Sequence, residues 1–357
     1  MSASIREAGG DDNHMFHDDN LLTTDKKIVF YGAGKYARDF ARRHCVDASH
    51  IRLPDYVCDR DPAKWGADFL GVPIGSPDRL DEETADGLIV IVTTCPFFVL
   101  GDVHNHLYYH DFYTAAALEM RFLLAERPAG EIEQTRALFA DDKSRRVFDA
   151  LTRRQAAGQI WFRDVYEPHP YFCNDVVCSL LDGEVFVDAG AYLGGHIAAF
   201  GRANPNFRAV YAFEPHRPHF AALADRFAHD RRVKPFAQGL YDQNTQLAFA
   251  DDNALGAHVV PVGEDGAQTI VDVVRLDDAV DDDVSYIKMD IEGAELSALA
   301  GCEATIRRNR PKLAICTYHR PGDYLDIPRF VNTLRPDYRL YLRQHSSFNV
   351  DTVLYAV

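Results

Sequence analysis

The sequence predicts two α/β domains joined by a helical segment. Short apolar strands alternate with helical stretches over residues 27–114 and again over 185–357, a pattern typical of mostly parallel sheets. The segment between these runs is rich in Ala, Leu, Glu and Arg, which favours helices. We therefore expect a disordered N-terminus at 1–24, a smaller α/β domain at 25–114, a helical connector at 115–164 and a larger domain at 165–357.

The composition is that of a globular protein, with 47% hydrophobic and 26% charged residues among 357. The net charge of −16 repels phosphate backbones and anionic membranes, so we expect no nucleic-acid partner. The seven cysteines are scattered without a C-x-x-C pair, which indicates reduced thiols. The first residues lack a signal-peptide core, and no apolar run approaches the length of a membrane helix. The expected location is the cytoplasm.

The smaller domain begins with a strand, a glycine turn and a helix. The strand KIVFY at 27–31 runs into Gly32-Ala33-Gly34, and a helical pattern follows at 36–44. A second strand at 55–58 ends at Asp59, 60–80 is predicted as a loop dense in Gly and Pro, and 88–93 is an apolar run typical of a buried parallel strand. A helix at 98–110 and a strand at 111–114 complete this Rossmann-like domain.

The larger domain contains more predicted strands, ending in an antiparallel pair. They are 185–188, 210–213, 233–237, 248–249, 271–274, 285–289, 312–317, 338–342 and 352–356. A mostly parallel sheet of seven strands with a closing hairpin is the architecture of class I methyltransferases. The sequence therefore predicts that α/β fold class for residues 165–357.

The stretch VFVDAGAYLGGHIAAF at 185–200 predicts a cofactor loop. A parallel strand ends at Asp188, and Gly190, Gly194 and Gly195 lead into a helix, so the backbone turns sharply and approaches a ligand closely. An acid at the start of this loop repels a pyrophosphate but suits the ammonium group of an amino-acid moiety. The second strand ends at Glu214, where an acid grips a ribose diol.

Two acids at neighbouring strand ends predict a nucleoside cofactor. The acid after the second strand favours an unphosphorylated ribose, as in S-adenosylmethionine (SAM) or NAD rather than NADP, and the acid of the loop suits the amino-acid part of SAM. The adenine edge is expected after the third strand, within 236–242. The predicted cofactor contacts are Asp188, Ala189, Gly190, Ala191, Tyr192, Gly194, Glu214, Pro215, Gly239 and Leu240.

The stretch YIKMDIEGAE at 286–295 predicts the catalytic edge. Asp290 stands at the carboxyl end of a strand and Glu292 follows it, while His319 comes just after the strand KLAICT. A carboxylate or a neutral imidazole there would take the proton of an acceptor hydroxyl. Alternatively, the same three side chains hold a divalent cation that binds the hydroxyl. The sequence leaves both mechanisms open.

Several motifs resemble the FkbM family of methyltransferases. They are FVDAGAYLGG, YAFEP, RLDDAV, YIKMDIEGAELSAL and the ending YRLYLRQHSSFNVDTVLYAV, in this order over about 171–357. The resemblance implies a class I fold, SAM as donor and O-methylation of a sugar, glycan or natural product. It places the methionine part at Asp188, Gly190 and Gly194 and the ribose at Glu214. The family's serine-rich loop reads DDNALGAHVV here.

The N-terminal unit IVFYGAGKYARDF is similar to nucleotide-binding domains attached to sugar-modifying enzymes. Gly32, Gly34 and Ala37 form Gly-x-Gly-x-x-Ala, and Asp59 follows 25 residues after Gly34. One alternative function is therefore an NAD-dependent sugar-modifying enzyme centred on this domain, although no Tyr-x-x-x-Lys pair stands at a suitable position. A second alternative is a non-catalytic nucleotide-binding scaffold.

Overall fold

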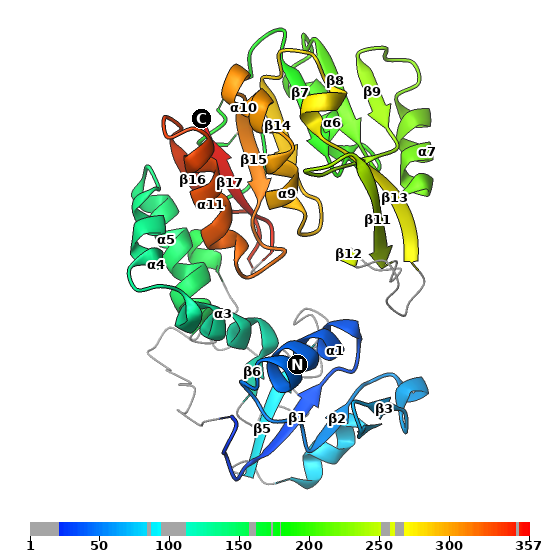
Figure 1. Cartoon of the computed structure of the whole chain (residues 1–357), viewed down its shortest axis with the longest axis vertical. Coiled ribbons are helices and arrows are strands. Elements are labelled where there is room, and N and C mark those ends of the chain that lie inside the picture. Colours follow the sequence, from blue (N-terminus) through cyan, green and yellow to red (C-terminus); the bar gives the residue numbers. More distant parts are fainter. Residues whose placement is uncertain are drawn as a thin grey trace, which may run out of the picture. The chain divides into compact units, whose positions relative to one another are not determined.

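The chain forms two compact units in the computed structural model (Figure 1). The first contains Met1–Glu126 with Arg153–Gln159, and the second Arg127–Thr152 with Ile160–Val357. The structure describes residues 21–83, 87–93, 112–156, 162–172, 174–178, 180–250, 258–260, 268–347 and 350–357. The helix predicted at 98–110, most of the predicted N-terminal segment and most of the DDNALGAHVV loop lie outside the described residues.

A six-stranded sheet forms the centre of the first unit, in the order β3-β4-β2-β1-β5-β6. Its strands are parallel except for β3, which pairs antiparallel with β4. Their bounds are β1 Lys27–Tyr31, β2 Tyr56–Cys58, β3 Asp68–Phe69, β4 Val72–Gly75, β5 Leu88–Val92 and β6 Phe112–Thr114. The smaller α/β domain expected from the sequence is thus present.

Two helices cover one face of this sheet. Helix α1 (Lys35–Ala41), which continues as a wider π-helical turn over Arg42–Asp47, and helix α3 (Ala115–Glu126) contribute Phe40 and Leu118 to a core with Phe30. The expectation of an unbroken loop over 60–80 is wrong, because β3 and β4 lie within it. Strand β4 pairs with β3 on one side and β2 on the other, and Phe69 and Ile74 are buried there. The local sequence does not show this pairing, because β4 is a four-residue run that contains a proline.

The second unit contains a seven-stranded sheet in the order β16-β17-β15-β14-β7-β8-β9. Its strands are parallel except that β17 is antiparallel to both of its neighbours. Their bounds are β7 Val185–Ala189, β8 Ala209–Phe213, β9 Val233–Phe236, β14 Tyr286–Met289, β15 Lys312–Cys316, β16 Leu340–Gln344 and β17 Thr352–Ala356. This architecture confirms the predicted class I methyltransferase fold.

Four further strands form a separate sheet in the order β10-β13-β11-β12. Their bounds are β10 Gly239–Leu240, β11 Thr245–Ala250, β12 His258–Val260 and β13 Gln268–Val274. The strands predicted at 248–249 and 271–274 belong here, outside the seven-stranded sheet. Strand β10 follows β9 almost directly, so this sheet begins beside the carboxyl edge of the main one.

The helices of the second unit flank the seven-stranded sheet (Figure 1). Their bounds are α4 Glu131–Ala137, α5 Asp142–Asp149, α6 Gly195–Ala203, α7 Arg217–Arg226, α8 Leu276–Ala279, α9 Glu295–Ala300, α10 Glu303–Asn309 and α11 Asp323–Leu334. Helices α4 and α5 come from the predicted connector, whose first helix, α3, belongs to the first unit. None of the helices in the described ranges has the length and apolarity needed to span a membrane.

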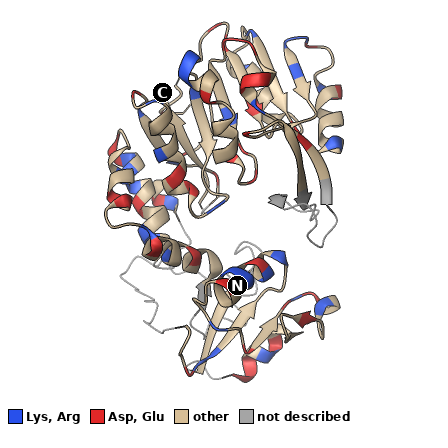
Figure 2. Ribbon diagram, in the orientation of Figure 1, with Lys and Arg blue, Asp and Glu red and all other residues tan. Residues whose placement is uncertain are grey.

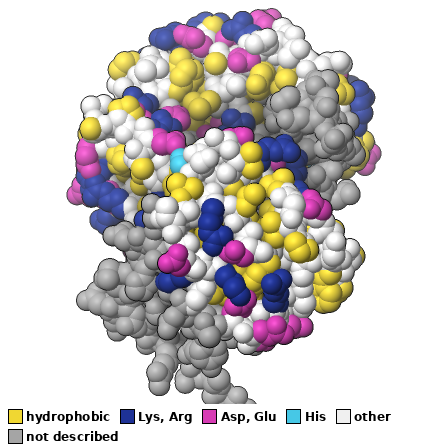
Figure 3. Space-filling model, turned by 60° about the horizontal axis from the view of Figure 1, so that its bottom comes forward, with side chains coloured by type: hydrophobic (Ala, Val, Ile, Leu, Met, Phe, Trp, Pro, Cys, Tyr) yellow, Lys and Arg dark blue, Asp and Glu magenta, His cyan; other side chains and the backbone are white. Residues whose placement is uncertain are grey.

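Charged residues lie mainly on helices and loops, whereas the central strands are mostly uncharged (Figure 2). On the face in Figure 3, the described Lys and Arg side chains lie among acidic and apolar ones. Two charged residues of the central strands, Lys288 in β14 and Asp188 in β7, are fully buried. A buried charge in a central strand requires partners, and these lie at the candidate site.

Candidate functional site

The carboxyl ends of four parallel strands bring most of the predicted site residues to one edge of the sheet. Strands β7, β8, β14 and β15 run parallel and adjacent. Asp188 is the next-to-last residue of β7, and Glu214 and Asp290 directly follow β8 and β14. His319 lies three residues after the end of β15. In open α/β sheets, ligands bind at this edge.

The loop after β7 is held in place by the end of β8. The amides of Gly190 and Ala191 donate to the carbonyl oxygen of Phe213 at 3.0 and 3.1 Å. The amide of Tyr192 donates to Oε2 of Glu214 at 2.8 Å. Three consecutive backbone groups are therefore fixed, so the loop has a defined shape before any ligand enters.

Two glycines of this loop occupy positions that exclude a side chain. Gly190 has φ of 76°, and a Cβ there would lie 1.9 Å from the carbonyl oxygen of Asp290. Gly194 has φ of 75° at the start of α6, and a Cβ would lie 2.4 Å from the ring of Phe227. The backbone thus approaches both β14 and α7 closely, which makes the narrow turn needed to expose amides to a ligand.

Asp188 is fully buried and paired with a lysine that sequence reasoning missed. Its Oδ1 lies 3.0 Å from Nζ of Lys288, and both side chains are 0% exposed. Oδ2 has no hydrogen-bond partner within the described part of the chain. Burial disfavours the charged lysine, but the carboxylates of Asp188 and Asp290 raise the pKa of Lys288 above its usual value. Asp188 is therefore not a free countercharge for a cofactor ammonium.

Glu214 retains acceptor capacity for a ribose. Its Oε2 accepts from the amide of Tyr192, and its Oε1 accepts from the amide of His216 at 3.0 Å. A carboxylate offers about four lone-pair sites, so two remain for the hydroxyls of a diol. The side chain is 6% exposed, which suits a contact inside a covered site.

Two of the predicted cofactor contacts, Pro215 and Gly239, are neighbours. A Cβ on Gly239 would lie 3.6 Å from Cγ of Pro215 and 3.3 Å from Val273. Leu240 is 2% exposed, and Ala189 is fully buried at the end of β7. Pro215 and Gly239 thus lie together where β8 and β10 begin or end, while Leu240 and Ala189 have side chains in the interior.

Asp290 is held by two tyrosines and a histidine. Its Oδ2 accepts from the hydroxyl of Tyr171 at 3.4 Å and its Oδ1 from that of Tyr318 at 3.2 Å. Nε2 of His319 lies 3.4 Å from Oδ1. Burial alone would raise the pKa of Asp290, but the charges of Lys288 and His319 lower it below its usual value. Asp290 is therefore ionised at neutral pH and 25% exposed at the strand edge.

His319 is charged rather than neutral, which corrects the expectation of a neutral imidazole near pH 7. Burial disfavours the cation, but a 2.8 Å contact of Nδ1 with the buried Glu295 and the charges of nearby acids raise the pKa of His319 to about 9. An imidazolium cannot accept a proton. Of the three predicted catalytic residues, only Asp290 and Glu292 are then available as bases.

Glu292 lies in a tight turn between β14 and α9. Its φ is 55°, a left-handed conformation that is rare for glutamate and is concentrated at functional sites. Its carboxylate is 40% exposed and lies 3.7 Å from Nε2 of His319. Asp290, Glu292 and His319 therefore do form one cluster. Within the described residues, however, no group of three His, Cys, Asp or Glu is arranged to hold a metal ion.

A segment before β7 carries Tyr171 into this cluster. Tyr171 has φ of 68°, its amide donates to the hydroxyl oxygen of Tyr355 at 2.8 Å, and its ring centroid lies 5.6 Å from Nζ of Lys288. Asn174 donates to the same Tyr355 hydroxyl at 3.1 Å. These contacts attach the segment to Lys288 of β14 and Tyr355 of β17.

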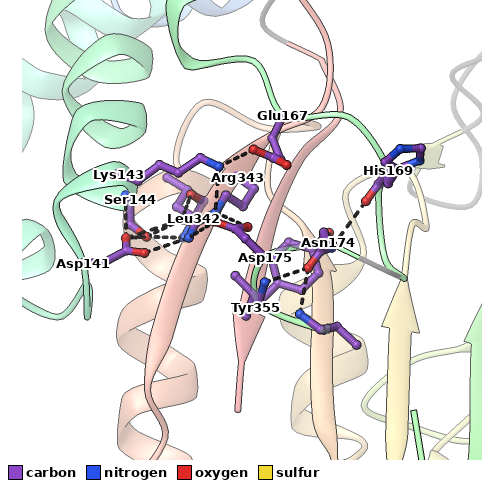
Figure 4. A network of polar contacts seen from close by, with 12 residues as sticks. Asp141, Lys143, Ser144, Glu167, His169, Asn174, Asp175, Leu342, Arg343 and Tyr355 are labelled. Carbon is purple, nitrogen blue, oxygen red and sulfur yellow. Dashed lines mark hydrogen bonds and ion pairs between the residues drawn. The ribbon is translucent and has the colours of Figure 1, made fainter. Parts of the chain in front are cut away.

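A buried arginine anchors the same segment to α5 (Figure 4). Arg343, whose side chain is 2% exposed, lies between Asp141 and Asp175 with N–O distances of 2.7 and 2.9 Å. It also donates to Ser144 at 2.9 Å. Helix α5, strand β16 and the segment before β7 are thus joined through one guanidinium group.

Sequence reasoning missed Lys288, Tyr171, Tyr318 and Glu295. Only Lys288 carried a signal, as a charged residue within the otherwise apolar run YIKM. The tyrosines and Glu295 look like ordinary core or helix residues until the fold brings them to Asp290 and His319.

In the first unit, Asp59 forms its hydrogen bonds within the chain, including one with the glycine turn after β1. Oδ2 of Asp59 accepts from the amide of Ala33 at 2.8 Å and from Nζ of Lys64 at 2.9 Å, and Oδ1 accepts from the amide of Asp61 at 2.9 Å. The carboxylate that follows the Gly-x-Gly-x-x-Ala motif by 25 residues is thus engaged by three donors of the chain itself.

Comparisons with known proteins agree with this geometry. Residues 188–345 match the family described as Methyltransferase FkbM domain. The crystal structure of methyltransferase FkbM from Methylobacillus flagellatus KT is 24% identical, aligns over 97% of this chain and 95% of that chain, and has a TM-score of 0.65. No curated protein matches the chain by sequence.

Two further solved structures align with about half of the chain. An rRNA methylase from Streptococcus thermophilus is 18% identical over 49% of this chain and 87% of its own, with a TM-score of 0.33. Fibrillarin from Aeropyrum pernix, solved with S-adenosyl-L-methionine, is 14% identical over 49% of this chain and 67% of its own, with a TM-score of 0.31.

The fold and the loop between β7 and α6 define the second unit as a class I, SAM-dependent methyltransferase domain. The resemblance noted in the sequence motifs is confirmed. This domain is an FkbM methyltransferase domain over residues 188–345.

Proposed function

We propose that the chain transfers the methyl group of SAM to a hydroxyl oxygen of a sugar, glycan or natural-product acceptor. One observation carries the proposal. The ionised Asp290 lies at the carboxyl end of β14, directly beside the cofactor loop. Its carbonyl oxygen is so close to Gly190 that a Cβ at that position would lie 1.9 Å from it. A carboxylate in this position can take a hydroxyl proton next to the cofactor.

The residues of the β7–β8 edge fit the cofactor. The loop from Gly190 to Gly194 would hold the methionine part, Glu214 the ribose, and Pro215 with Gly239 one side of the adenine. When bound, SAM supplies an electrophilic methyl group, whose bond to sulfur breaks as the acceptor oxygen forms its new bond. Orientation of the acceptor accounts for much of the rate in such transfers, about 7–11 kcal/mol.

Asp290 would receive the proton that the acceptor hydroxyl loses. Tyr171 and Tyr318 hold its two oxygens, so the carboxylate has a fixed direction. His319, as an imidazolium bound to Glu295, keeps Asp290 ionised rather than acting as a base. Glu292, more exposed on the strained turn, would contact the hydroxyls of the acceptor.

The test uses the full chain with SAM carrying a deuterated methyl group and fractions of glycans and small metabolites. We expect mass spectrometry to find a labelled methyl ether, which survives alkaline treatment that cleaves methyl esters. Asp290→Asn should lower turnover about 10²–10⁴-fold while SAM affinity changes little. Asp337→Asn, an exposed acid beyond α11, is the matched control. A label on nitrogen or carbon would overturn the proposed O-methylation.

A further inference from the structure

Lys288 is a buried cation at the centre of the seven-stranded sheet. It is the third residue of β14, in register with Asp188 of β7, and its side chain is 0% exposed. Strand β14 has neighbours on both sides, β7 and β15. A lysine fully removed from water needs a carboxylate and hydrogen-bond acceptors for its three N–H groups.

The contacts of Lys288 are directed at the cofactor loop. Its Nζ lies 3.0 Å from Oδ1 of Asp188 and donates to the carbonyl oxygens of Gly190 at 3.0 Å and Ala189 at 3.4 Å. The ring of Tyr171 closes the remaining side, with its centroid 5.6 Å from Nζ. One carboxylate oxygen and two carbonyl oxygens thus surround the ammonium group, and all belong to the last residues of β7 and the first residue of the loop.

The loop is therefore held from two directions. Phe213 of β8 accepts from the amides of Gly190 and Ala191, and Lys288 of β14 donates to the carbonyl of Gly190. The peptide planes on both sides of Gly190 are fixed by these opposite contacts. Gly190 has a positive φ, so its planes would rotate readily without them.

We propose that Lys288 is a positioning residue for the cofactor: it fixes the carbonyl of Gly190 and the carboxylate of Asp188, and so sets the shape of the loop that receives SAM. The inference rests on the cofactor site of the proposed function. The Lys288–Asp188 pair is neutral as a whole, so its contribution is the geometry of the loop rather than attraction of the cofactor's charge.

This role predicts equal losses for two ligands of different charge. S-adenosylhomocysteine lacks the sulfonium charge of SAM but shares the groups that the loop contacts. The double variant Asp188→Asn with Lys288→Met replaces the ion pair by neutral side chains. It should lower the affinity for both ligands about tenfold to a hundredfold, the effect of losing hydrogen bonds from a charged donor. Calorimetric titration of the full chain with each ligand measures this.

A second readout needs no ligand. Hydrogen exchange of the unliganded protein, followed by mass spectrometry on peptides covering 186–194, should be faster in the double variant, because the loop opens locally. The matched control is Glu184→Gln with Lys312→Met. That partly buried pair joins the amino ends of β7 and β15, opposite the site, and its replacement should change neither the affinities nor this exchange.

Asp188→Asn with Lys288→Gln covers the case in which the Met variant does not fold. It removes both charges together and keeps an N–H donor for the carbonyl of Gly190, so both affinities should fall by the same factor, and by less than in the Met variant. Unchanged affinities in a folded Met variant, or a loss confined to SAM in either variant, would each overturn the role of Lys288. Failure of the wild type to bind either ligand would instead overturn the cofactor site itself.

Discussion

Replacing Gly190 by alanine would test how tightly the cofactor loop is packed against β14. The new Cβ would lie 1.9 Å from the carbonyl oxygen of Asp290, an atom that cannot move away easily. The amide of Asp290 is bonded to the carbonyl of Ala189 at 3.1 Å, which ties β14 to β7 beside the clash. Alanine is also strained at φ of 76°.

The expected loss follows from these two terms. Overpacking against rigid neighbours costs about 1–3 kcal/mol, and a left-handed alanine costs about 1–2 kcal/mol. Gly190→Ala should therefore lower the stability of the second unit by about 2–5 kcal/mol, or about 4–20 °C in melting temperature for a unit of this size. Scanning calorimetry of the unliganded full chain measures the shift.

The neighbouring Gly195 provides the control. It is the first residue of α6, has no positive φ, and a Cβ there meets nothing within 4 Å. Gly195→Ala should leave the unit as stable or stabilise it by about 0.5–1 kcal/mol, since alanine favours the helix. If Gly190→Ala melted at the wild-type temperature, or if the two variants shifted equally, the close packing of the loop on Asp290 would be refuted.

Two further predictions concern stability. His319 has a pKa of about 9 in the folded chain and about 6.5 when unfolded. Its contribution, on the order of 3 kcal/mol, is fully present below about pH 6.5 and is lost as pH rises through about 9. Denaturant unfolding across this range should show that loss in the wild type and a flatter profile in His319→Gln, and parallel profiles would contradict the assignment. Arg343→Met removes the guanidinium group that Asp141 and Asp175 share and leaves only Lys143 beside Asp175. Because both acids are partly exposed, it should cost about 1.5–3 kcal/mol in denaturant unfolding. The exposed Arg307, paired with Glu303, is the control, and its replacement by Met should cost at most about 1 kcal/mol; equal losses would show that the Arg343 network is not buried.

The strands of the six-stranded and seven-stranded sheets were largely predictable because apolar runs indicate burial. The runs 27–31 and 352–356 coincide with β1 and β17, and the runs ending at Asp188 and before Asp290 locate β7 and β14 within a residue. Parallel strands put their carboxyl ends at one edge, so the site's location followed from the strand assignment. Strands β3 and β4 were missed because their pairing, rather than their local pattern, makes them strands.

The ionisation of the site was not predictable, because it depends on partners that are distant along the chain. Asp188 and Lys288 lie 100 residues apart and meet only through the register of β7 and β14. His319 becomes a cation because Glu295 projects from α9 onto its Nδ1. Motif spacing shows which titratable groups reach an edge, but the pKa of each group depends on neighbours from other strands and helices.

This dependence changes how the two acids at the strand ends should be understood. From the sequence, Asp188 and Glu214 are predicted to be free carboxylates that bind the cofactor directly. In the fold, Asp188 neutralises Lys288, and Glu214 accepts the amide of Tyr192, so both act first on the loop between β7 and α6. A loop held from β8 and β14 before the ligand arrives loses less entropy on binding. We therefore expect the acids to favour the proposed cofactor chiefly by building its site, with the spare acceptors of Glu214 left to contact it directly.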